Sequence, residues 1–227
     1  MQEEGSKEVH FDYCFLRNKK GSDYAPVLVS KSRPHKLITA HVVPNKGGST
    51  DWIIKQSVLD IEKSGFHQEV VIRSDGEPAL KEVIDQVAKA RRGRTVMENT
   101  AKGESQANGF IERGIQSFEE LVRLYKLDLE SRIKVRLEVN WIIFEWLVEY
   151  AADAINKFVI GSDGMTAWER VKGRKHHGEF VRCCSYVMYR VAGSVQGGVM
   201  TERWMPGLWL GKRFHTDEHI VMNFENG

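Results

Sequence analysis

The fold of this chain is decided by the stretch Ser105-Gln-Ala-Asn-Gly-Phe-Ile-Glu-Arg113, which we expect to lead into a helix. Apolar residues from here on recur at helical offsets, as on a buried face: Ile111, Ile115, Phe118, Leu121, Val122 and Tyr125. Glu112 lies beside this stripe, and we expect it one turn after Asn108-Gly109, at a helix start where free N–H groups favour an anion. A carboxylate held there is well placed to serve a metal site. Taken alone, Glu112 is more simply explained as an acid favoured by the helix dipole.

Two further acids stand in β-type patterns. Asp12 lies in His10-Phe-Asp-Tyr-Cys-Phe-Leu16, where aromatic residues alternate with Asp12 and Cys14 as in a strand. Asp75 ends the apolar run Glu69-Val-Val-Ile-Arg-Ser-Asp-Gly76, so we expect it at the carboxyl end of a strand, where active-site acids commonly stand. The gaps between the three acids are 75 − 12 = 63 and 112 − 75 = 37 residues.

This order and spacing resemble the Asp, Asp, Glu triad of retroviral and retrotransposon integrases. Two phrases, Ile72-Arg-Ser-Asp-Gly76 and Asn108-Gly-Phe-Ile-Glu-Arg113, are similar to the best-known blocks of the copia-type branch. The similarity covers nearly the whole chain. The region from Trp141 to Arg174 resembles the end of such cores, and Arg203-Trp204 with Gly207-Leu-Trp-Leu-Gly211 resembles the small β domain that follows them.

The resemblance implies an enzyme that trims DNA 3′ ends and joins them to target DNA by in-line phosphoryl transfer. Asp12, Asp75 and Glu112 would be both the catalytic residues and the metal ligands. Three carboxylates suit two hard divalent ions, Mg²⁺ first and Mn²⁺ second, with Asp12 bridging both ions. The implied partners are DNA, as element ends and as target, and further copies of the chain, with no membrane partner.

The expected fold class is α/β, a ribonuclease H-like mixed five-stranded sheet flanked by helices and followed by a small all-β barrel. A three-strand meander is predicted from the strand of Asp12 and two β-rich runs, Tyr24–Ser30 and Lys36–Val43, which Lys31-Ser-Arg-Pro34 separates. Four helices are predicted, over 50–64, over 78–88, from Ser105-Gln-Ala-Asn-Gly-Phe-Ile-Glu-Arg113 to about 129, and over 141–158, and Thr50 is the expected N-cap of the first. Two further strands are predicted, one ending at Asp75 and one around 95–97. Residues 102–109 are expected to form a mobile loop.

Composition indicates two domains. A length of 227 residues suits a core over 1–160 and a small β-barrel-like domain over 161–227. With 41% hydrophobic and 28% charged residues, and no apolar run of membrane-spanning length, the chain is expected to be soluble and intracellular. The resemblance implies action in the nucleus, as part of a retrotransposon polyprotein. Three cysteines without a C-x-x-C pattern indicate a reducing compartment, and the adjacent pair is not expected to bridge.

Basic residues are the candidate DNA contacts, because the net charge of only +2 makes local patches matter more than the total. The run Lys89-Ala-Arg-Arg-Gly-Arg94 is equally a solvated helix end and, if the triad is real, a patch that flanks the site and binds phosphates. The full candidate set is Lys89, Arg91, Arg92, Arg94, Lys102, Asn108 and Arg113. Scattered cations further on, such as Arg182 and Lys212, are expected to be solvated.

Several alternatives stay open. A related Asp-Asp-Glu transposase would share all the chemistry, a domesticated and catalytically idle DNA-binding module would lack it, and a structural protein would carry the triad by coincidence. A zinc site at His176-His177 and Cys183-Cys184 is disfavoured, because adjacent strand residues point to opposite faces. Gln116 and Glu119 stand one and two turns after Glu112, where retroviral enzymes often carry lysines, which puts the mode of DNA-end contact in doubt.

Overall fold

The computed structural model describes residues 6–19, 23–47, 50–99, 105–190 and 203–224. Its elements follow in the order β1 (Glu8–Arg17), β2 (Tyr24–Arg33), β3 (Ile38–Val42), α1 (Asp51–Lys63), β4 (Val70–Ser74), α2 (Pro78–Ala90), β5 (Thr95–Asn99), α3 (Ser105–Ile133), α4 (Ile142–Phe158), α5 (Ala167–Lys172), β6 (Ser185–Arg190), β7 (Trp204–Lys212) and β8 (His219–Asn223).

The first five strands form one mixed sheet in the order β3-β2-β1-β4-β5. Strands β1, β2 and β3 pair antiparallel as a meander, whereas β4 pairs parallel with both β1 and β5. The parallel pairs are separated in sequence by α1 and α2, since parallel neighbours need a crossover connection. The predicted five-stranded mixed sheet with helices is confirmed.

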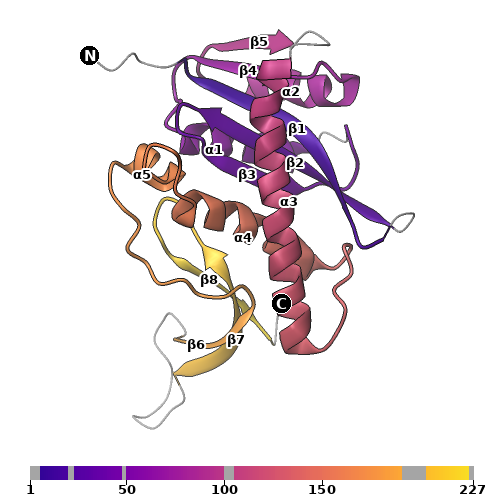
Figure 1. Cartoon of the computed structure of the whole chain (residues 1–227), viewed down its shortest axis with the longest axis vertical. Helices are drawn as coiled ribbons and strands as arrows, with labels where there is room; N and C mark the ends of the chain where they lie inside the picture. The colour runs from indigo at the N-terminus through magenta and orange to yellow at the C-terminus, as the bar shows by residue number, and fades with distance from the viewer. Residues whose placement is uncertain (1–5, 20–22, 48–49, 100–104, 191–202, 225–227) are drawn as a thin grey trace.

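The alternation within β1 divides the sheet into two faces. Val9, Phe11 and Tyr13 belong to one buried cluster with residues of α1 and α2. Cys14 belongs to the other cluster, which continues through α3 and α4. Figure 1 shows the result, with α3 running across the front of the sheet and α1 and α2 behind it.

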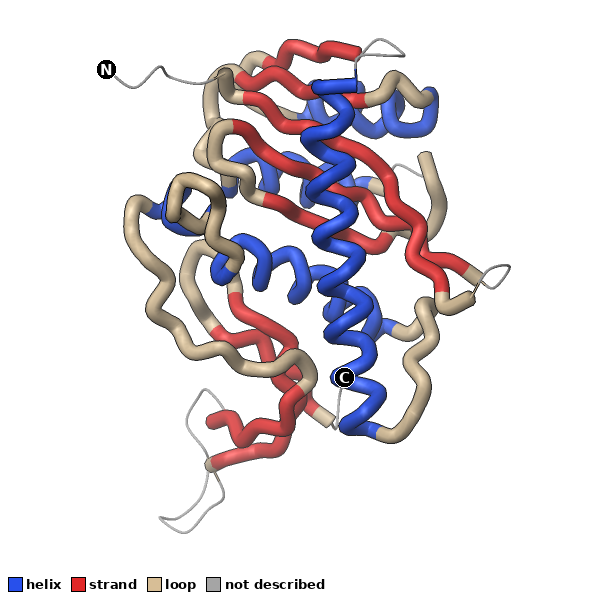
Figure 2. Tube along the Cα trace, viewed as in Figure 1, coloured by secondary structure: helices blue, strands red, loops and turns tan. Residues whose placement is uncertain are grey.

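Helix α3 is a single helix of 29 residues and the longest element of the described chain. It begins at Ser105, so the predicted loop is wrong from that residue on, and its earlier part lies outside the described residues. Its buried residues include Ile111, Phe118 and Val122, as the sequence pattern predicts. Figure 2 shows this helix passing from the five-stranded sheet to the second, smaller sheet.

Strand β2 is longer than expected. It continues through Lys31 and Arg33, which pair with His10 and Glu8 of β1, so the predicted break at Lys31 is wrong. Two aromatic residues near the starts of α1 and α4 are half exposed: Trp52 is 49% and Trp141 is 43% accessible. Thr50 does lie at the N-cap of α1, but its side chain makes no capping hydrogen bond.

A polar network is buried between β3, α1 and α4. His41 lies 2.7 Å from Asp60 and 3.0 Å from Glu149, and Lys63 donates to Asp60 over 2.7 Å. Burial disfavours the imidazolium, but the two carboxylates outweigh burial and raise the pKa of His41 to about 9. His41 and Lys63 likewise outweigh burial at Asp60 and hold its pKa below the usual range.

Residues after 160 form a short helix and a second sheet. Thr166 caps α5 through a reciprocal capping box with Glu169, and β6, β7 and β8 pair antiparallel in chain order. Trp209 of β7 and Cys183 belong to the same buried cluster as α3 and α4, so this sheet packs directly on the long helix layer. No helix in the described ranges is both long and apolar enough to cross a bilayer.

Candidate active site

Asp12 lies in the middle of β1, on the sheet face that α3 covers. It pairs with Val29 of β2, and its Oδ1 accepts a hydrogen bond of 2.7 Å from the Tyr13 backbone N–H. This local bond fixes the carboxylate at the strand surface. The side chain is partly buried, because α3 passes over this face of the sheet.

Asp75 follows directly after β4, as the sequence predicts. Strands β1 and β4 run parallel, with His10 opposite Arg73, so two residues further along Asp12 and Asp75 stand at the same level. The Asp75 Oδ1 accepts a 2.9 Å hydrogen bond from the Glu77 N–H, which orients the carboxylate at the turn into α2.

Glu112 reaches the same place from α3. It is 112 − 105 = 7 residues beyond the first residue of the helix, which places it two turns inside. The expectation that Glu112 stands at the helix start is therefore wrong. The helix dipole does not account for its position either, because the dipole effect falls off within the first turn. Its position comes instead from the packing of α3 on the sheet, through Ile111 at 5% exposure.

The three acids line one pocket of about 90 Å³. The other lining residues are His10, Phe11, Arg73, Ser74 and Ile111. A strand, a strand end and a helix thus bring together side chains that lie 63 and 37 residues apart in sequence. In the described part of the chain, no group of three or more His, Cys, Asp or Glu side chains stands close enough together to hold a metal ion.

The electrostatics of the pocket are those of crowded acids. Burial, together with the charges of Asp75 and Glu112, raises the pKa of Asp12 to about 6, against the opposing hydrogen bond from the Tyr13 N–H. Because burial and the charges of Asp75 and Glu112 disfavour ionisation of Asp12, a positive charge that enters the pocket would favour the Asp12 carboxylate.

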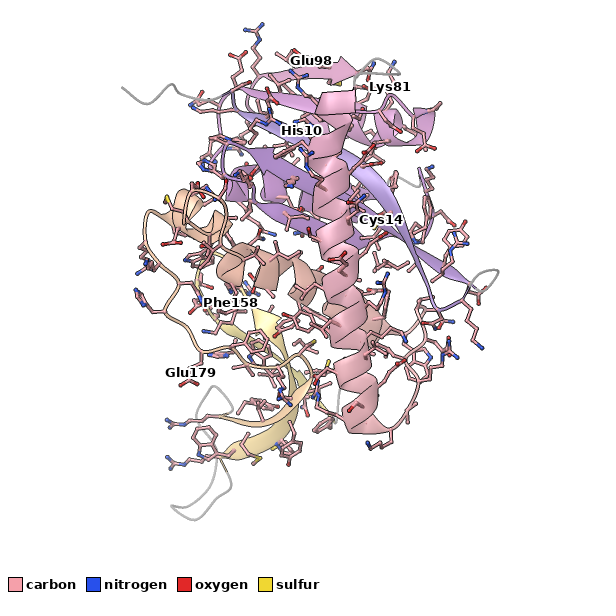
Figure 3. The ribbon with its side chains drawn as sticks, viewed as in Figure 1. His10, Cys14, Lys81, Glu98, Phe158 and Glu179 are labelled. Atoms are coloured by element: carbon pink, nitrogen blue, oxygen red, sulfur yellow. The ribbon has the colours of Figure 1, made fainter. Side chains whose placement is uncertain are left out.

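Beside the three acids the sheet face carries cations that the sequence reading missed. The Phe110 ring lies 4.9 Å from the His10 ring, while the Lys31 Nζ and the Arg33 guanidinium each lie 4.5 Å from its centroid. His10 and Cys14, two residues to either side of Asp12, both lie close to α3 (Figure 3). Lys31 and Arg33 follow Val27 and Val29 at intervals of two residues, so in one continuous strand all four side chains lie on the same face. This spacing is the sequence signal that could have located the two cations.

Lys31 fastens α3 to the sheet. Its Nζ donates a 3.0 Å hydrogen bond to the Phe110 carbonyl, two residues before Glu112. A Cβ at Gly114, two residues after Glu112, would lie 2.8 Å from the Lys31 Cδ, so the glycine makes room for this side chain. Burial, together with the nearby charges of Arg113, Lys36 and Arg33, lowers the pKa of Lys31 to about 8.

The basic run over 89–94 does not flank the acids. Arg94 stands beside Val70 at the amino end of β4, whereas Asp75 follows the carboxyl end. The five residues between them place the run about 16 Å away along the strand. Arg91 serves the fold, since it is 8% exposed and donates to the Phe66 carbonyl (2.8 Å) and the Thr95 hydroxyl (2.6 Å).

The other candidate DNA contacts differ in their surroundings. Lys89, Arg92 and Arg94 are exposed, and Arg94 lies 3.5 Å from Glu69. Arg113 is exposed on α3, next to Glu112. Lys102 and the side chain of Asn108 lie outside the described residues.

Comparison with known proteins identifies the fold. The chain matches no protein-family model and no curated protein. Among solved structures it is similar to the HTLV-2 integrase catalytic core domain in complex with magnesium, with 15% identity, 71% of this chain and 93% of that chain covered, and a TM-score of 0.51. It is also similar to a chain in the structure of the simian T-cell lymphotropic virus intasome in complex with the PP2A regulatory subunit B56 gamma, with 13% identity, 96% of this chain and 76% of that chain covered, and a TM-score of 0.54. The five-stranded sheet and its helices therefore have the ribonuclease H-like fold of retroviral integrase cores.

Proposed function

We propose that the chain is a DNA-integrating polynucleotidyl transferase, which trims DNA 3′ ends and joins them to target DNA by in-line phosphoryl transfer. The observation that carries this proposal is the meeting of Asp12, Asp75 and Glu112 in one pocket. The likeness of the fold to integrase cores supports it.

The residues present fit divalent metal ions. Asp12, Asp75 and Glu112 supply only carboxylate oxygens, the donors that Mg²⁺ and Mn²⁺ prefer. The mutual repulsion that raises the pKa of Asp12 is relieved by a cation. Two bound ions would stabilise charge on the attacking and leaving oxygens of the phosphoryl group. The protein itself contributes the fixed strand positions of Asp12 and Asp75 and the Lys31 contact that holds α3 at Glu112.

DNA is the proposed substrate, and its phosphates have a cationic surface beside the acids. Three neighbouring cations contribute to the lowered pKa of Lys31, namely Arg113, Lys36 and Arg33. In the described part of the chain, none of these four cations lies within 4.0 Å of a carboxylate. We propose Arg113 as the contact nearest the reacting phosphate. The exposed Lys89, Arg92 and Arg94 would bind a more distant DNA segment, and the DNA roles of Lys102 and Asn108 stay predictions.

The finer assignment is a copia-type retrotransposon integrase that acts in the nucleus as part of a polyprotein. Its support is the sequence phrases around Asp75 and Glu112. We also propose that residues 161–227 form the small β-barrel-like domain that follows such cores, with β6, β7 and β8 as its described part. A homo-oligomer is proposed, supported by the exposed apolar residues Trp52 and Leu59 on α1 and Ile142 on α4.

The test is cleavage and rejoining of a labelled branched oligonucleotide that mimics a strand-transfer product. This reverse reaction needs only the acids and a bound DNA junction. We expect product with Mn²⁺ or Mg²⁺, none with Ca²⁺, whose looser coordination does not hold the reacting oxygens in line, and none with Glu112→Gln. Glu120→Gln is the matched control, because it removes an exposed carboxylate eight residues further along α3.

Equal activity of wild type and Glu112→Gln would refute the site assignment. DNA binding without turnover in Mn²⁺, at any protein concentration, would instead identify a catalytically idle DNA-binding module.

A further inference from the structure

Two adjacent thiols that take no part in the proposed chemistry stand in contact. The sulfur atoms of Cys183 and Cys184 lie 3.3 Å apart, and both residues are buried, at 3% and 6% exposure. Cys14 is buried as well, at 5%, and is a free thiol on the distant strand β1. The convergence of two sulfurs is therefore particular to residues 183 and 184.

The backbone explains how neighbouring side chains reach the same side. Cys184 has a φ of +57°, so the pair lies in a turn just before β6 and not within the strand. The expectation that the two side chains point to opposite faces is wrong for this reason. The turn is held by the Cys184 N–H, which donates to the Trp209 carbonyl over 2.9 Å. Such a φ is costly for a residue other than glycine and persists only where its surroundings impose it.

Helix α3 completes the surroundings of the pair. The Arg132 guanidinium donates to the carbonyl of Cys183 over 2.6 Å and to that of Cys184 over 3.3 Å. The hydrogen bond between the two sulfurs lowers the pKa of Cys184, against burial, and the nearby Arg132 lowers it further. The same bond raises the pKa of Cys183, and burial adds to this effect. When the pair loses one proton, the negative charge is therefore favoured on Cys184 and the remaining proton on Cys183.

The pair has a path to solvent. A pocket of about 220 Å³ opens beside Cys183. It is lined by Leu124, Tyr125, Asp128, Arg132, Tyr150, Phe180, Arg182 and Cys183. A small neutral oxidant fits this volume and there lies next to Cys183, whose sulfur is 3.3 Å from that of Cys184.

We propose that Cys183 and Cys184 are a redox modification site, which hydrogen peroxide converts into a disulfide between adjacent residues. The Cys184 thiolate attacks a peroxide oxygen, the O–O bond breaks, and hydroxide leaves. The Cys183 sulfur then attacks the resulting sulfenic acid, an S–S bond forms, and water leaves with the Cys183 proton. One peroxide is reduced to two waters, and two thiols are oxidised to one disulfide.

The product is easily reduced again. Adjacent Cα atoms lie about 3.8 Å apart across a trans peptide, which is closer than the roughly 4.4 Å minimum of ordinary disulfides. Strained disulfides of this kind are reducible and belong to the labile or regulatory class. Closing the ring draws the sulfurs from 3.3 Å to about 2.05 Å, and this reorients the two carbonyls that Arg132 holds.

The experiment follows the tryptic peptide Cys183–Arg190, which begins after Arg182 and contains no other cysteine. The folded protein is treated with hydrogen peroxide, alkylated, digested and weighed. We expect this peptide to be lighter by two hydrogens and to carry no alkyl group, and dithiothreitol treatment before alkylation to restore two alkylated cysteines. Cys14→Ser leaves this result unchanged, whereas Cys184→Ser abolishes it.

Met188 in the same peptide is an internal measure of oxidant exposure, because it is 47% exposed. A peptide that carries Met188 sulfoxide and two alkylated cysteines would overturn the proposal, since the oxidant had reached the segment without closing the ring. Disulfides between separate chains at these cysteines would overturn it as well. Both results come from the wild-type protein, so a poorly folding variant does not decide the outcome.

Discussion

The substitution Asp12→Asn is expected to stabilise the metal-free protein at pH 7.5 while removing its proposed activity. Burial and neighbouring acids raise the pKa of Asp12 from 3.8 to about 6. A folded-state pKa above the unfolded value means that the folded state binds the proton more tightly. The stability penalty is therefore absent below pH 3.8, grows between pH 3.8 and about 6, and is constant above. About two pKa units at roughly 1.4 kcal/mol each give about 3 kcal/mol, which partial exposure and solvent screening reduce to about 1–2 kcal/mol.

The assay is urea unfolding in the presence of EDTA at pH 4 and pH 7.5. Asp12→Asn should be more stable than wild type at pH 7.5 and nearly equal to it at pH 4. Asp85→Asn on α2, on the other side of the sheet, is the matched control and should show no such pH dependence. With Mn²⁺ added, only wild type should gain stability, because the cation binds the folded state alone. An equal effect of Asp12→Asn at both pH values would refute the electrostatic reasoning.

Three further predictions concern stability, each measured by urea unfolding. Gly114→Ala should lower the free energy of unfolding by about 0.5–2 kcal/mol, because the helix-propensity gain of about 1 kcal/mol is smaller than the loss of the charged hydrogen bond of Lys31. Gly109→Ala meets no such contact and should raise the free energy of unfolding. His41→Gln should lower the free energy of unfolding by about 3–5 kcal/mol at pH 7. In the wild type, the stabilisation by protonated His41 is complete below pH 6.5 and should disappear as the pH rises through about 9. Arg91→Met should cost about 1–3 kcal/mol, because it leaves buried carbonyls unpaired. A change below about 0.5 kcal/mol in any of the three variants would contradict its assignment.

The order of the elements in the core was predictable because local patterns and the tertiary fold agree. The alternation around Asp12 and the helical stripe from Ile111 each indicate burial on one face of an element. The turn after Asp75 indicates the end of a strand. Once the fold is right, the meeting of the three acids follows from parallel pairing of β1 with β4 and from α3 crossing above them.

The errors arise where tertiary contacts override local preference. Ser105 to Gly109 have loop-like composition, yet they extend α3, since propensity is a weak prior. Lys31 and Arg33 read as a strand break because cations are usually exposed. In the structure their side chains lie against Phe110 and the strand continues beneath them. The positive φ of Cys184 has no signature in sequence.

Because α3 is long, a small tilt of the helix displaces its far residues by a large distance. Glu112 and Arg132 are 20 residues apart on one unbroken helix, which corresponds to about 30 Å. A tilt of about 5° about the Arg132 end would therefore displace Glu112 by about 2.6 Å. Lys31 restrains the end that carries Glu112, whereas the carbonyls of Cys183 and Cys184 restrain the other. A contact of the turn before β6 and a contact beside one of the three acids thus stand on the same unbroken helix.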